Sequence, residues 1–255
     1  MIDWSALHDA YGPADAIPVL LEQAAGRDQE AIDRLWDRLC HQGTVSSASL
    51  AALPLLAEIA KTKVLGDWAL DLAGAIAGGL LQDHLDNEEV ACCAPALAQL
   101  REAAAARLGP DHDGPTYLGL LRALLAFDGR PLWFEALNDF TDSFFTVDCP
   151  HCGAAVTTAI GDYGCYSSIR DWHLGDVHQV PLRPAAPHEL SGVGKMLHEL
   201  VARDDQTRLA WGLTHLFGRA ECPGCGSVFG IGEEYEAANA PIPWGFARSH
   251  VKDAP

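Results

Sequence analysis

The sequence contains the pattern C-P-x-C-G twice, as Cys149-Pro150-His151-Cys152-Gly153 and as Cys222-Pro223-Gly224-Cys225-Gly226. We call these stretches the first and the second knuckle. The proline and the glycine favour a tight turn that directs both sulfurs of a knuckle to one point. Four thiolates close a tetrahedron around zinc and leave no position for water. We therefore predict one structural Zn²⁺ ion, with these ligands: Cys149, Cys152, Cys222 and Cys225.

The main alternative for a C-x-x-C pair is a redox thiol motif. Such a motif normally ends a strand and opens a helix, whose end lowers the pKa of a thiol. Here β-like runs follow both knuckles, at 154–160 and 227–231, and another precedes the first at 143–147. This order predicts a small zinc-ribbon-like β module near the C-terminus. Because zinc contributes on the order of 10 kcal/mol to the folding of such modules, we expect loss of one knuckle to unfold this part.

The segment between the knuckles is long and of mixed character. Residues 161–188 form an insert that we expect to be a loop followed by a proline-rich connector, and two helical patterns follow at 189–203 and 205–217. The insert has ligand-type side chains whose spacing matches no closed metal set, so we interpret it as a polar loop. The insert is also a candidate polar site, with these residues: Asp171, His173, Asp176 and His178.

Apolar residues recur at helical spacing through residues 13–142 and indicate an array of helices. Pro18, Pro54 and Pro95 each occur in a similar apolar stretch, 36 and 41 residues apart. That spacing is close to the period of roughly 40 residues in HEAT repeats. We expect each proline to lie inside a helix and kink it. The second helices of the repeats are predicted at 28–39, 67–81 and 115–127.

These patterns together predict a mainly α fold. We expect a HEAT-like helical-repeat solenoid with a small zinc-ribbon-like β module near the C-terminus. The predicted domains are a helical-repeat array at 1–142, a zinc-knuckle module with an inserted loop and helix pair at 143–239, and an irregular tail at 240–255.

The formal net charge is −18, and residues 1–148 carry 23 acidic against 9 basic side chains. Such a surface repels phosphate backbones, so nucleic-acid binding is disfavoured and a basic partner is favoured. No apolar run suits a membrane span, and no signal peptide is recognised. Eight cysteines in a chain with these features indicate metal ligands and small core residues rather than disulfides. We therefore expect a cytoplasmic protein with no membrane partner.

The N-terminal part resembles a known group of proteins. His8-Asp9-Ala10-Tyr11-Gly12, Ala16-Ile17-Pro18 and His41-Gln42-Gly43-Thr44-Val45 are similar to the opening of bacterial, largely actinobacterial, HEAT-repeat-containing proteins of unassigned function. The resemblance covers roughly residues 3–145, and the two-knuckle part is also similar to members of that group. HEAT proteins generally act as scaffolds, so the resemblance implies binding of a macromolecule rather than catalysis.

Two function classes follow from the sequence. The first is a non-catalytic zinc-containing scaffold that binds a protein partner, for example an immunity-type protein that neutralises a basic toxin. The alternative is an enzyme acting on a small molecule, with a site between the helical array and the 161–188 insert. The sequence shows no recognisable nucleophile–base pair, phosphate-binding loop or open metal triad, so we predict no catalytic residue.

Overall fold

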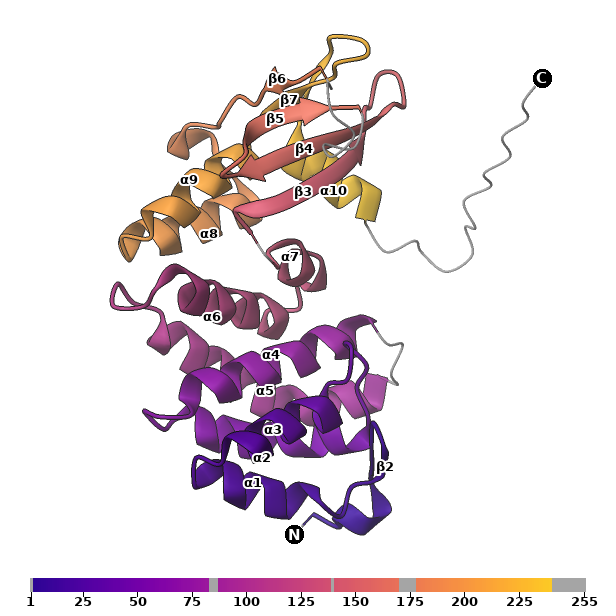
Figure 1. The fold of residues 1–255 in the computed structure, drawn as a ribbon, viewed down its shortest axis with the longest axis vertical. Coiled ribbons are helices and arrows are strands. Elements are labelled where there is room, and N and C mark those ends of the chain that lie inside the picture. The colour runs from indigo at the N-terminus through magenta and orange to yellow at the C-terminus, as the bar shows by residue number, and fades with distance from the viewer. Residues whose placement is uncertain (1, 83–86, 139, 170–177, 240–255) are drawn as a thin grey trace, which may run out of the picture. The chain divides into compact units, whose positions relative to one another are not determined.

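The computed structural model describes residues 2–82, 87–138, 140–169 and 178–239. The chain divides into two compact units. Unit 1 comprises Met1–Phe140 and Met196–Trp211, and unit 2 comprises Thr141–Lys195 and Gly212–Pro255. The fold is mainly helical with small antiparallel sheets, as predicted (Figure 1). None of the helices in the described ranges has the length and apolar character that crossing a membrane requires.

Unit 1 is built from a short N-terminal hairpin and a series of helices. Helix α3 packs against α4 and α5, and α6 packs against α4 and α5. The helices predicted at 28–39, 67–81 and 115–127 are present as α2, α4 and α6. The bounds are β1 (His8–Asp9), β2 (Gly12–Pro13), α1 (Ile17–Ala25), α2 (Gln29–Leu39), α3 (Ser47–Ala60), α4 (Gly66–Gln82), α5 (Asn87–Arg107), α6 (Gly114–Phe127) and α7 (Pro131–Ala136).

Local sequence explains where these helices begin. The Asp28 carboxylate accepts hydrogen bonds from backbone N–H groups in the first turn of α2, and Asp113 does the same for α6. Pro54 and Pro95 lie inside α3 and α5, as predicted. The prediction for Pro18 is wrong, because it lies in the first turn of α1. A proline there removes no intrahelical hydrogen bond, since first-turn N–H groups have no partner in the helix.

The core of unit 1 consists of aliphatic side chains at helical spacing. Two such residues one turn apart on each helix point to the same side and pack on neighbouring helices. The fully buried members include Leu35 and Leu39 of α2, Leu53 and Leu56 of α3, Leu72 and Ile76 of α4, and Leu121 and Leu125 of α6.

Unit 2 is centred on a four-stranded antiparallel sheet in the order β3-β4-β5-β6. A separate hairpin, β7–β8, leads into α10, which packs against β3 (Figure 1). The strands predicted at 143–147, 154–160 and 227–231 are present as β3, β4 and β8, and β7 precedes the second knuckle. The bounds are β3 (Asp142–Asp148), β4 (Ala155–Gly161), β5 (Gly164–Ser168), β6 (Val180–Pro181), β7 (Arg219–Glu221), β8 (Val228–Gly230) and α10 (Ile231–Asn239).

Strand β5 corrects the expectation of a loop at the start of the 161–188 insert. Ser167 and Ser168 are fully buried, so this strand lacks the apolar alternation by which strands are recognised. The Ser167 hydroxyl lies 2.7 Å from the Glu221 carbonyl oxygen and donates a hydrogen bond to it. The burial of a polar side chain is thereby compensated, and β5 is tied to β7.

The predicted helix pair is present as α8 (Gly192–Arg203) and α9 (Thr207–Leu216). Its central part, 196–211, groups with unit 1. The buried Tyr117 hydroxyl donates to the Asp204 carboxylate at 2.8 Å, and the Gln206 amide donates to the His112 carbonyl at 3.0 Å. These bonds join the turn between α8 and α9 to α6 and the loop before it.

Candidate metal centre

The first knuckle is a tight turn between β3 and β4. The Cys149 N–H donates to the Ala154 carbonyl at 2.8 Å, and the Gly153 N–H donates back to the Cys149 carbonyl at 2.9 Å. Gly153 has a φ of 72°, in the left-handed region that glycine adopts without steric cost. The glycine of the C-P-x-C-G pattern therefore closes the turn in the way the sequence predicted.

The second knuckle repeats this structure between β7 and β8. The Cys222 N–H donates to the Ser227 carbonyl at 2.8 Å, and the Gly226 N–H donates to the Cys222 carbonyl at 2.8 Å. Gly226 has a φ of 74°. In each knuckle the first cysteine is buried and the second is exposed. The two turns thus have the same hydrogen bonds, the same glycine conformation and the same pattern of exposure.

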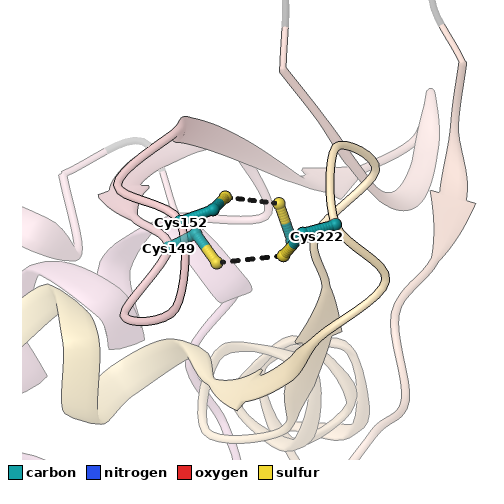
Figure 2. Close-up of side chains that lie close together, drawn as sticks. Cys149, Cys152 and Cys222 are labelled. Atoms are coloured by element: carbon teal, nitrogen blue, oxygen red, sulfur yellow. Dashed lines mark hydrogen bonds between the residues drawn. The ribbon is translucent and has the colours of Figure 1, made fainter.

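The four cysteine sulfurs form one cluster. The Sγ atoms of Cys149 and Cys225 lie 3.7 Å apart, and those of Cys152 and Cys222 lie 3.8 Å apart. Figure 2 shows Cys149 and Cys152 of the first knuckle facing the second knuckle at Cys222. All four sulfurs lie within 4.8 Å of one another. A tetrahedron with metal–sulfur bonds of about 2.3 Å has edges of about 3.8 Å. These two sulfur pairs therefore have the spacing of a tetrahedral thiolate site, and each pair joins the two knuckles.

The thiols differ in acidity before a metal is considered. The hydroxyl and then the backbone N–H of Ser227 lower the pKa of Cys225 to about 6, against the effect of burial. For Cys152 the largest single effect comes from the Ala154 N–H, which lowers the pKa. The contact with Cys225, burial and the other two thiols act in the opposite direction, and together they raise the pKa to about 12. Crowded thiols resist losing several protons, and a bound cation removes that resistance.

Ser227 is a contributor that the sequence analysis missed. Its position after the second knuckle corresponds to Ala154 after the first, so only the second knuckle has a hydroxyl donor for its exposed sulfur. A serine two residues after a C-x-x-C pair is the signal that would have indicated it.

The other cysteines lie outside this cluster. Cys40 and Cys93 are buried in unit 1, as expected of small core residues, whereas Cys92 is exposed. Cys165 on β5 is partly exposed, and burial raises the pKa of its thiol.

The candidate polar site in the insert lies mostly outside the described residues. Asp171, His173 and Asp176 lie outside the described residues, and His178 is exposed in a segment without regular secondary structure. Within the described ranges, the four knuckle cysteines are the one group of three or more metal-ligand side chains close enough to share an ion.

No family model matches the chain, and no curated protein and no solved structure matches it significantly. The class of the site is therefore defined by its donor set alone. Four thiols converging from two turns are compatible with a single metal ion.

Proposed function

We propose that the chain is a non-catalytic, zinc-containing helical-repeat protein that binds a macromolecular partner. The observation that carries this proposal is the spacing of the cysteine sulfurs, 3.7 and 3.8 Å across the two knuckles. Four thiolates at tetrahedral spacing fill the coordination sphere of zinc and leave no position for water or substrate. The metal then stabilises unit 2 and performs no chemistry.

Zinc is the proposed ion because closed four-thiolate sites typically hold structural zinc. Iron is the other metal that takes four thiolates in a tetrahedron, and it absorbs visible light whereas zinc does not. We expect purified protein to be colourless and to contain one zinc ion per chain. The free cysteines support a reducing compartment, so we place the protein in the cytoplasm.

The binding role is assigned to the helices of unit 1, as a HEAT-like array. In the proposed array, α3 and α4 form one helix pair, and α5 and α6 form the next. Helix α3 packs on α4 and on α5, and α4 packs on α6. Stacked helix pairs have this pattern, since each helix contacts its own partner and the equivalent helix of the next pair. The spacing of Pro54 and Pro95, both inside first helices, supports the same interpretation.

The partner is proposed to be a basic protein, as in an immunity-type complex. Residues 1–148 carry 23 acidic against 9 basic side chains. A surface of this charge attracts basic proteins and accelerates their association, and added salt screens the attraction.

A pull-down with zinc-loaded protein as bait tests this proposal. We expect a basic protein from the native host to be retained at about 50 mM salt and largely released at about 500 mM, where the Debye length is shorter. As a matched pair, Glu30→Gln with Asp37→Asn on the exposed face of α2 is expected to weaken retention more than Glu233→Gln with Glu234→Gln on α10. Failure to retain any protein at low salt, or equal effects of the two variants, would contradict the assignment to unit 1.

A further inference from the structure

Unit 2 contains a cleft beside the first knuckle that the metal site does not use. Its volume is about 570 Å³, within the range of about 300–1,000 Å³ that small-molecule sites occupy. Apolar residues, among them Leu190 and Val228, form part of its wall. Its charged and titratable lining residues are His151, Arg183, Glu189, Arg219, Glu233 and Glu234.

Strand pairing places two of these arginines next to each other. Arg183 and Arg219 are directly opposite, and the backbone N–H of each donates to the carbonyl of the other, at 2.9 and 2.8 Å. Arg219 is also opposite Gly230 on β8. Residues directly opposite in a sheet project to the same face. Both arginine side chains therefore leave the backbone on the face where a side chain at Gly230 would project.

A carboxylate occupies the space over Gly230. A Cβ atom added to Gly230 would lie 2.9 Å from Glu233 Oε2. Across these three strand segments the cleft therefore presents two guanidinium groups followed by a carboxylate. Glu234 and Glu189 add further negative charge to the lining.

The two arginines are not equally neutralised. The Arg183 guanidinium donates to the Glu221 carboxylate at 2.6 Å. Within the described part of the chain, no hydrogen bond or ion pair is assigned to the Arg219 guanidinium, and Arg219 is exposed. Like charges directly opposite in a sheet are unfavourable. An anion held by Arg219 next to Arg183 relieves that repulsion.

We propose that this cleft binds a small zwitterion, an amino acid or short peptide. Arg219, next to Arg183, takes the carboxylate, for which the planar guanidinium offers two parallel N–H donors. Glu233 and Glu234 take the ammonium group, and the apolar wall contacts the ligand side chain. This site goes beyond partner binding by unit 1, and its failure leaves that proposal intact.

The test uses the full zinc-loaded chain and three probes: L-alanyl-L-alanine, its N-acetyl form and its C-terminal amide. Calorimetric titration should give saturable one-to-one binding of the dipeptide, with a dissociation constant on the order of 1 mM or lower. Each blocked form loses one charge, so each is expected to bind at least about tenfold more weakly. Absence of saturable binding of the dipeptide overturns the proposal, as does a blocked form that binds as tightly as the dipeptide.

Two variants identify the binding groups. Arg219→Gln is expected to weaken dipeptide binding about tenfold or more, whereas Arg130→Gln, an exposed arginine in unit 1, is expected to leave it unchanged. Glu233→Gln should reduce the preference for the dipeptide over its N-acetyl form. The zinc content of each purified variant shows whether it is folded. If Arg219→Gln lowers the zinc content, the Glu233→Gln variant alone tests the proposal. Unchanged dipeptide affinity in a folded Arg219→Gln protein, or unchanged preference in Glu233→Gln, overturns the proposal.

Discussion

The two knuckles have the same turn but different support. The first closes a hairpin in which β3 and β4 pair over seven residues each, from Asp142↔Gly161 to Asp148↔Ala155. The second closes a hairpin of only three residues in each strand. The turn therefore depends on the local C-P-x-C-G sequence and not on the length of the strands around it. The two turns are therefore brought together by the rest of unit 2 and by the proposed metal ion.

The second knuckle has contacts that offset its short strands. Strand β7 pairs with Arg183 on its other side, and Ser167 of β5 donates to the Glu221 carbonyl. Ser227 supplies a hydroxyl to the Cys225 sulfur, where the first knuckle has Ala154. The first knuckle is thus held by its own hairpin, and the second by neighbouring strands and by the cluster.

The largest expected effect comes from removing one buried sulfur from either knuckle. Cys149→Ser and Cys222→Ser should each abolish stoichiometric zinc binding and unfold unit 2, because zinc contributes on the order of 10 kcal/mol to such folds. Elemental analysis and amide hydrogen exchange measure the two effects.

Cys165→Ser is the matched control, since Cys165 lies in unit 2 outside the cluster. It is expected to retain one zinc ion per chain. A Cys149→Ser or Cys222→Ser protein that also keeps one tightly bound zinc would show that the four cysteines are not a single site.

The next effect concerns the unequal hairpins. In the zinc-loaded protein, amides in the middle of β7–β8 should exchange about a hundredfold faster than those in the middle of β3–β4, since fewer cross-strand hydrogen bonds must open together. Phe229 and Phe145 are suitable reporters, because both are buried and each faces a partner in the register, Ala220 and Thr158. Equal protection of the two amides would show that the metal cluster, not strand length, controls local opening.

Substitution of either turn glycine, Gly153 or Gly226, is expected to have a smaller effect, of the same size at both positions. Gly153→Ala and Gly226→Ala should each destabilise unit 2 by about 1–2 kcal/mol, because alanine is strained at a positive φ. No atom lies within 4 Å of the added Cβ at either position, so the cost arises from the backbone alone. Chemical denaturation of the zinc-loaded protein measures it.

Gly224→Ala is the control for the turn glycines. Its Cβ would meet Cys222 Sγ at 3.7 Å, an ordinary contact, and its φ is not positive. Little change is expected there. If Gly226→Ala proved harmless while Gly153→Ala did not, the two turns would not be equivalent.

The smallest effect is expected from Ser227→Ala, which makes the second knuckle resemble the first. Loss of the hydroxyl donor should weaken zinc affinity by less than about tenfold, as expected for one hydrogen bond. Competition with a chromophoric chelator measures the change. The reciprocal Ala154→Ser tests the comparison from the other side, and a lower zinc affinity in that variant would contradict a favourable role for the hydroxyl.

The sequence predicted the turns because each depends on five adjacent residues, and it predicted the clustering of the four cysteines because zinc requires four ligands. It did not predict β5, where the buried Ser167 hydroxyl is satisfied by the carbonyl groups of Val180 and Glu221, which are distant in the chain. The hydrogen bond that attaches the α8–α9 turn to α6 was also not predicted. It depends on Tyr117 and Asp204, which are distant in sequence and show no local pattern.

The cleft was not predicted either, since Arg183 and Arg219 become neighbours only when two strand segments pair. Helices α2, α4 and α6 of unit 1 were predicted well, because their apolar residues recur at helical spacing. Pro18 was the exception, since the pattern does not distinguish a first-turn proline from one inside a helix.

The most direct test of the central claim is X-ray absorption at the zinc edge on protein purified without added metal. We predict one zinc ion per chain with four sulfur neighbours at about 2.3 Å and no lighter ligand atom. Fewer than four sulfur neighbours, or oxygen or nitrogen in the first coordination shell, would mean that the site is open. Iron in place of zinc, or no bound metal, would contradict the claim that a closed zinc site joins the two knuckles.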